Sequence, residues 1–143
     1  MCFDRSVKRI NKIREYGREE FFVLDCLKDE IPECDVLITT CLFYHYLKGM
    51  IPILLEKLSK NVHKKIILLA PNGAVQKELY GDHAYHPIPD EILLEAEKQG
   101  LVFEEHYWMK DRIPSTGEWN DKGVFILVLS KKELNLQFFE NYK

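Results

Sequence analysis

The stretch Met1-Cys2-Phe3-Asp4-Arg5-Ser6 determines how the rest of this sequence is interpreted. An apolar residue, an acidic residue and a serine occur here in turn, which is typical of a strand end that leads directly into a helix cap. An open α/β domain normally has a complete strand and a glycine-rich turn before such a strand end. We therefore expect an α/β fold in which the N-terminal unit is missing.

Helical periodicity appears at three places after this stretch. Ser6 is a suitable cap for a helix over residues 7–16, in which apolar side chains recur every three positions. Residues 47–58 have leucines at helical spacing, and Pro52 stands early in that segment, where its missing backbone donor costs least. A further helix is expected over residues 89–99, because a proline begins it and a glycine follows it.

Short apolar runs without alternation lie between these helices. They cover residues 21–24, 36–38 and 66–70, and turn-forming or acidic residues bound each of them. Strands with this pattern are buried on both faces of a parallel sheet. Two further strands are expected over residues 101–108 and 124–129. The segment between them is long enough to predict a functional loop rather than a tight hairpin turn.

Length and composition are those of an ordinary globular chain. We expect one domain over residues 1–143, of which 46% are hydrophobic. The net charge of -3 does not predict electrostatic capture of nucleic acid over the whole surface. No apolar run reaches the roughly 18 residues of a membrane span, and no signal peptide is recognised, so we expect a cytoplasmic protein without a membrane partner.

The cysteines and histidines give no strong metal signal. The four cysteines contain no C-x-x-C pair, and a buried thiol in the cytoplasm behaves as a small hydrophobe. His83 and His86 form a His-x-x-His pair that lacks a third ligand at a fixed spacing. We therefore expect structural cysteines and predict no metal site. The cysteines are Cys2, Cys26, Cys34 and Cys41.

The alternation of strand and helix predicts parallel pairing through right-handed crossovers. In such sheets, ligands bind outside the carboxyl ends of the strands. The residues expected at those ends are Asp4, Asp25, residues 39–45 and residues 71–73. We therefore expect the functional site at this edge of the sheet.

Three segments at these strand ends resemble, in their order along the chain, the class I S-adenosylmethionine-dependent methyltransferases. They are Phe3-Asp4-Arg5-Ser6, Val23-Leu24-Asp25-Cys26 and residues 35–45, in which a strand ends in small polar residues before a hydrophobic turn and a histidine. The resemblance covers residues 2–131. It implies a Rossmann-like methyltransferase sandwich with a mostly parallel sheet and a C-terminal antiparallel hairpin.

The resemblance also implies S-adenosylmethionine as the cofactor. Asp4, with Arg5 beside it, matches the acidic position that binds the ribose hydroxyls in that family. Asp25 and Cys26 match the place that meets the adenine. Thr39 matches the end of the strand that lines the methyl-transfer cleft. From the residues alone, Asp4 and Asp25 have a structural alternative, as a helix-start carboxylate and a turn residue.

The chain departs from the family at one place. The family's first strand and glycine-rich turn have no counterpart here, since none of the seven glycines stands in a G-x-G pattern. The missing strand would be central in the sheet, between the second and the fourth. Three possibilities stay open: another chain supplies the unit, the remaining strands re-pair, or the sequence is part of a longer enzyme.

Four more residues are candidates for chemistry at the site. His45 is the best candidate for a general base. The alternative is a structural histidine whose ring nitrogens form hydrogen bonds with backbone groups at a helix start. Tyr44, Asn72 and Tyr85 are predicted to contact the methyl acceptor. For Tyr44 the alternative is an ordinary core aromatic.

Two functions from different classes follow from these observations. The first is an S-adenosylmethionine-dependent methyltransferase, or the larger part of one, that acts on an unidentified substrate. The second is a catalytically silent methyltransferase-like subunit that uses an exposed sheet edge to form a homodimer or to bind a second chain that completes the sheet. Another nucleotide-binding α/β protein is a weaker third interpretation.

Overall fold

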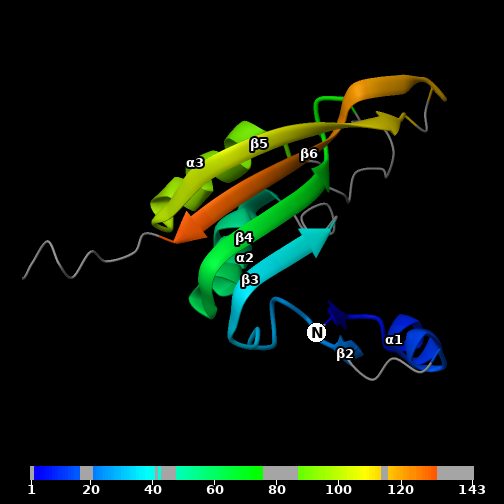
Figure 1. Cartoon of the computed structure of the whole chain (residues 1–143), viewed down its shortest axis with the longest axis vertical. Coiled ribbons are helices and arrows are strands. Elements are labelled where there is room, and N and C mark those ends of the chain that lie inside the picture. Colours follow the sequence, from blue (N-terminus) through cyan, green and yellow to red (C-terminus); the bar gives the residue numbers. More distant parts are fainter. Residues whose placement is uncertain are drawn as a thin grey trace, which may run out of the picture.

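The computed structural model describes residues 2–16, 21–40, 42, 48–75, 87–113 and 116–131 (Figure 1). Helices and strands alternate through the first part of the chain, and two long strands follow one another at its end. In chain order the elements are β1 (Cys2–Asp4), α1 (Val7–Arg14), β2 (Phe21–Val23), β3 (Cys34–Thr40), the short 3-10 helix η2 (Lys48–Met50), α2 (Ile51–Lys60), β4 (Val62–Pro71), α3 (Pro89–Lys98), β5 (Leu101–Arg112) and β6 (Trp119–Lys131).

A four-stranded sheet with the strand order β3-β4-β6-β5 forms the larger part of the structure. β3 and β4 are parallel, with Thr40 opposite Leu69 at the carboxyl end of the pair. β6 is antiparallel to β4 and to β5. The predicted combination of parallel strands with a C-terminal antiparallel hairpin is therefore present.

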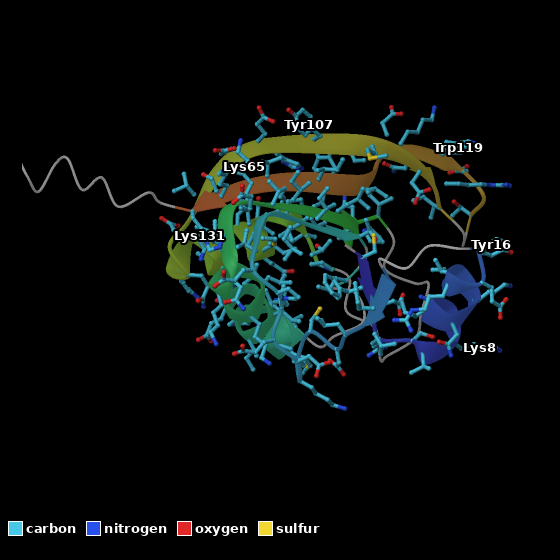
Figure 2. The ribbon with its side chains drawn as sticks, turned by 60° about the horizontal axis from the view of Figure 1, so that its bottom comes forward. Lys8, Tyr16, Lys65, Tyr107, Trp119 and Lys131 are labelled. Carbon is cyan, nitrogen blue, oxygen red and sulfur yellow. The ribbon has the colours of Figure 1, made fainter. Side chains whose placement is uncertain are left out.

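α2 and α3 pack on the same face of this sheet (Figures 1 and 2). Pro52 stands in the first turn of α2, and Gly100 ends α3 with a φ of 75°, a conformation that favours glycine. Both helices bury their apolar stripes against alternate residues of the strands. The core between these layers includes Leu54, Leu55, Leu58, Ile92, Ala96, Ile66, Leu68, Phe125, Leu127 and Leu129.

β1 and β2 form a separate two-stranded parallel sheet, and α1 connects them. Ser6 caps α1 as predicted, because its Oγ accepts a hydrogen bond from the backbone N–H of Arg9 at 3.3 Å. Leu24 and Ile31, which follow β2, are buried in the same core as α2 and β4. The small sheet therefore shares its hydrophobic core with the large one.

No described strand joins the two sheets. Figure 1 shows β1 and β2 beyond β3, so that the order across the molecule is β2, β1, β3, β4, β6, β5. The possibility that the remaining strands re-pair across the missing position is therefore wrong for the described residues. Each sheet keeps its own parallel pair, β1 with β2 and β3 with β4.

The long loop predicted between the last two strands is wrong. β5 and β6 pair from Leu101↔Lys131 to Arg112↔Trp119, so the connection is confined to residues 113–118. Register shifts after Phe103 and after Met109 let the ladder continue past polar residues that look like a loop in the sequence. Gly117 has a φ of 72° in the tight connection.

Candidate functional site

The two parallel pairs bring the predicted strand-end residues to the carboxyl edges of their sheets. In the small sheet Asp4 is opposite Val23, and Asp25 follows two residues later. In the large sheet, Thr39 and Thr40 are opposite Leu68 and Leu69, and Asn72 follows the end of β4. Asp4 and Asp25 therefore lie at the same end of one sheet.

Asp4 uses its carboxylate to organise the start of α1. Its Oδ1 accepts a hydrogen bond from the backbone N–H of Ser6 at 2.7 Å, and its Oδ2 lies 3.4 Å from Nη1 of Arg9. The side chain keeps 32% of its surface accessible, so one part of the carboxylate still faces solvent. Arg5, the next residue, is exposed. Asp4 therefore acts as a carboxylate at the start of the helix, which is the structural alternative, and the accessible part of its side chain is open to a ligand.

Asp25 begins a turn that stabilises the segment after β2. Its Oδ1 accepts from the backbone N–H of Leu27 at 3.0 Å, and its own N–H donates to Oδ2 of Asp29 at 2.7 Å. Lys28 lies 3.9 Å from the second carboxylate oxygen. These contacts fix the carboxylate at the strand end, with 26% of the side chain accessible.

Cys26 is held as a neutral thiol beside this carboxylate. Burial raises the pKa of its thiol, and the negative charge of Asp25 raises it further. Because the thiolate is the reactive form, this position does not favour a nucleophile. Cys26 instead packs against the hydrophobic core.

We expect Cys26 to be alkylated more slowly than the exposed Cys2. Its raised pKa lowers the thiolate fraction at a given pH, and its burial limits access. Time-resolved iodoacetamide labelling at pH 8, with peptide mapping by mass spectrometry, measures both rates in the same native sample. Equal rates in the native state would contradict the environment described for Cys26, and equal rates after unfolding are the control.

Thr39 presents an unusual buried hydroxyl at the end of β3. Its side chain is 7% exposed, and its Oγ1 finds no hydrogen-bond partner among the described residues. A buried hydroxyl without a partner is costly, so such a group frequently marks a place where a ligand or water binds. This is the strongest observation in favour of Thr39 as a site residue.

Asn72 is fully engaged in holding β4 to β6. Its Nδ2 donates to the carbonyl of Lys122 at 2.9 Å, and its backbone N–H donates to the carbonyl of Gly123 at the same distance. Its Oδ1 accepts from the N–H of Ala74 at 3.1 Å. Asn72 is therefore placed to shape the loop at this edge, since all its side-chain groups already have backbone partners.

An aromatic cluster near this edge has no counterpart among the sequence-based candidates. The rings of His106 and Trp108 lie 4.5 Å apart, and Nζ of Lys122 is 5.6 Å from the Trp108 ring. Nε2 of His106 is buried and has no partner among the described residues. In the sequence, this cluster is signalled by the run His106-Tyr107-Trp108. The pairing of β5 with β6 then places His106 opposite Leu127 and Trp108 opposite Phe125.

Several predicted residues lie outside the described part of the chain. They are His45, Tyr44, Tyr85 and Cys41. Within the described ranges, no group of three or more histidine, cysteine or acidic side chains gathers as a metal site. No described helix is long and apolar enough to cross a bilayer.

Comparison with solved structures identifies the fold. A Methanosarcina mazei S-adenosylmethionine-dependent methyltransferase is 12% identical, with a TM-score of 0.69, over 90% of this chain and 80% of that one. A Mesorhizobium loti S-adenosylmethionine-dependent methyltransferase is 9% identical, with a TM-score of 0.68, over 90% and 78%. The magnesium protoporphyrin IX methyltransferase of Synechocystis PCC 6803 with bound S-adenosylhomocysteine is 14% identical, with a TM-score of 0.65, over 91% and 63%. These likenesses confirm a methyltransferase-like α/β fold.

The chain is shorter than these neighbours. It spans 63% and 58% of the length of the Synechocystis enzyme in two of its structures, although 91% of this chain is matched in each. No protein-family model and no curated protein matches the sequence.

Proposed function

We propose that this chain is an S-adenosylmethionine-dependent methyltransferase, or the larger part of one. The observation that carries the proposal is the arrangement of parallel strands in a methyltransferase-like fold, with Asp4 and Asp25 at one edge of the small sheet. The Oγ1 of Thr39, which has no hydrogen-bond partner in the described part of the chain, supports a polar ligand at the corresponding end of β3. We also propose that the protein is cytoplasmic and consists of one domain.

The residues at these strand ends fit an adenosyl group. The accessible part of the Asp4 carboxylate offers acceptors for two ribose hydroxyls, with Arg5 alongside. Asp25 and Cys26 form a fixed polar and apolar pair suited to an adenine edge. The Thr39 hydroxyl can donate and accept hydrogen bonds, and no described residue uses this capacity.

When bound, S-adenosylmethionine supplies an activated methyl group on a sulfonium, which is already a good leaving group. The chain's own contribution is then mainly to orient the reactants and to exclude water. We assign His45 to the acceptance of a proton from the methyl acceptor, and Tyr44 and Tyr85 to contacts with that acceptor. Asn72 holds the end of β4 to β6 through its hydrogen bond to the carbonyl of Lys122.

The role of Asp4 is tested by replacing it with asparagine. The replacement keeps an oxygen for the Ser6 N–H but removes the charge, so we expect binding of S-adenosylmethionine to weaken by about 1.5–3 kcal/mol, the usual contribution of a charge-assisted hydrogen bond. Isothermal titration calorimetry with S-adenosylmethionine and S-adenosylhomocysteine measures the change.

Ser6→Ala is the matched control for this variant. It removes the hydrogen bond to the N–H of Arg9 and leaves the Asp4 carboxylate in place, so it reports on the helix cap alone. Unchanged affinity in Asp4→Asn would remove the ribose role of Asp4. Absence of any binding heat up to about 1 mM in the unmodified chain would reject autonomous cofactor binding, because that limit corresponds to about 4.1 kcal/mol of affinity.

A catalytically silent subunit is the second candidate function. It is favoured by the local use of both carboxylates, since Asp4 already binds Ser6 and Arg9 and Asp25 already binds Leu27. The two separate sheets also leave strand edges without a described partner. Such edges bind a second copy or another chain.

A further inference from the structure

The β5–β6 hairpin extends beyond the carboxyl end of β4. β4 pairs with β6 as far as Pro71 opposite Val124, whereas β5 and β6 stay paired as far as Arg112 opposite Trp119. Figure 1 shows the hairpin projecting past the end of β4, and Figure 2 shows Trp119 near its tip. Ligands of α/β sheets bind outside the carboxyl ends of the parallel strands. The projecting part of the hairpin therefore lies beside the edge of the sheet that carries the candidate site.

Three side chains of this hairpin, His106, Trp108 and Lys122, form what we call the hairpin cluster. The rings of His106 and Trp108 lie 4.5 Å apart, with an angle of 54° between their planes. His106 is opposite Leu127 and Trp108 is opposite Phe125, so both rings are on the face of the sheet that carries the core. Trp108 nevertheless keeps 39% of its surface exposed. The cluster therefore offers a planar apolar surface that a second ring holds in place.

Lys122 adds a positive charge to this surface. Its Nζ lies 5.6 Å from the centre of the Trp108 ring, which is the distance of a cation–π contact. Within the ranges that the structure describes, no acidic side chain forms an ion pair with Lys122, whereas Lys110 on the same hairpin lies 3.9 Å from Asp121. An ammonium group without an acidic partner favours a ligand that carries a negative charge.

The backbone of Lys122 is held at the end of β4. Its carbonyl accepts a hydrogen bond from Nδ2 of Asn72 at 2.9 Å, and the carbonyl of Gly123 accepts one from the backbone N–H of Asn72 at the same distance. The N–H of Lys122 donates to Oδ1 of Asn120 at 2.8 Å. The base of the Lys122 side chain is therefore fixed beside the Trp108 ring, and preorganisation of this kind lowers the cost of binding a ligand.

We propose that the hairpin cluster binds the methyl acceptor and that this acceptor is a planar aromatic compound with a carboxylate group. Its ring stacks on the accessible part of Trp108, and its carboxylate accepts a hydrogen bond from the ammonium group of Lys122. A cationic acceptor would be repelled by Lys122, and a non-aromatic acid would leave the Trp108 ring unused. This inference names the substrate class and rests on the proposed methyltransferase function. The alternative is a structural cluster that only holds the hairpin together.

The probe is 6-hydroxy-2-naphthoate, which is planar and carries a carboxylate. It is titrated to about 10 mM into the full chain with about 1 mM S-adenosylhomocysteine, and binding is followed by ¹H–¹⁵N NMR spectroscopy. The chain has two tryptophans, so each indole N–H gives its own signal, and Trp119→Phe assigns them. We expect a saturable shift of the Trp108 signal and no shift of the Trp119 signal. The probes 2-naphthol and cyclohexanecarboxylate each lack one of the two recognised features, and we expect them to bind about tenfold more weakly or worse.

Lys122→Met tests the role of the charge, because it keeps the length of the side chain. We expect it to weaken the binding of 6-hydroxy-2-naphthoate about tenfold and to leave the binding of 2-naphthol unchanged. Lys110→Met is the matched control, since the Lys110 side chain is 61% exposed on the same hairpin and pairs with Asp121. It is expected to leave both affinities unchanged. Equal weakening of both probes by Lys122→Met would indicate a structural cluster and would overturn the proposal.

The proposed methyltransferase function fails separately in these experiments. A saturable shift of the Trp108 signal that Lys122→Met weakens, together with no binding heat from S-adenosylmethionine, would reject the methyltransferase and retain a site for an aromatic acid. Binding heat from S-adenosylmethionine, with no shift of the Trp108 signal or with equal shifts of both indole signals, would retain the methyltransferase and overturn the aromatic acid as its acceptor.

Discussion

Replacing Phe125 with alanine is expected to lower the free energy of unfolding by about 3–5 kcal/mol, the usual cost of removing a large buried aromatic side chain. Phe125 is fully buried in the centre of β6, where it is opposite Ala70 of β4 and Trp108 of β5. Its removal leaves a cavity beneath the helical layer, which the small neighbouring Ala70 cannot fill. Urea denaturation monitored by circular dichroism measures the change.

Phe103→Ala is the control for residue type. Phe103 is on the adjacent strand β5 and is 50% exposed, so its truncation removes less apolar burial and creates no closed cavity. We expect less than half the effect of Phe125→Ala. A similar loss in both variants would contradict the difference in burial between the two rings, of which Phe125 is fully buried and Phe103 is 50% exposed.

Replacing Gly123 with alanine is expected to destabilise the chain by about 1–3 kcal/mol, the range for overpacking of a close-packed site. A Cβ at this position would lie 2.6 Å from Cβ of Asp111 and 3.0 Å from its backbone N. The contact is with the backbone of β5 at a register shift, so a side-chain rotation cannot relieve it. The substitution forces β5 and β6 apart.

The strain at Gly123 also reaches the candidate site. The carbonyl of Gly123 accepts the hydrogen bond from the N–H of Asn72, so a shift of β6 displaces the loop after β4. Gly49→Ala is the control, because nothing lies within 4 Å of a Cβ there, and we expect its stability to change by less than about 0.5 kcal/mol. A neutral Gly123→Ala variant would show that the two strands are not packed this closely.

The local elements were predictable because their signals lie within a few residues. Ser6 caps α1, Pro52 opens α2 and Gly100 ends α3, each through a backbone conformation or hydrogen bond to its near neighbours. The unalternated apolar runs at β2, β3 and β4 predicted these strands correctly. The burial on both faces that such runs indicate is not present among the described residues, since Val23 is 45% and Ile38 is 63% exposed. The strand-end positions of Asp4, Asp25 and Thr39 follow from these elements.

Other features depend on residues that are distant in the sequence. The length of the β5–β6 hairpin is set by cross-strand pairing through two register shifts, so polar residues 109–112 and 119–122 appear in a ladder rather than a loop. Asn72 acquires its partners only where β6 returns beside β4, fifty residues later. The aromatic pair of His106 and Trp108 is likewise placed by that return.

The separation of the sheets shows the same division. The family resemblance predicted that a central strand is missing, because Phe3-Asp4-Arg5-Ser6 matches the end of that family's second strand. The spacing of the sequence segments did not predict whether β1 and β3 would pair with each other, because that outcome depends on whether edge pairing or core packing is more favourable. Leu24 and Ile31 keep the small sheet on the common core, and its outer edge stays apart from β3. Local chemistry therefore specified the elements of this chain, and long-range packing specified how the described strands pair and which of their side chains form the common core.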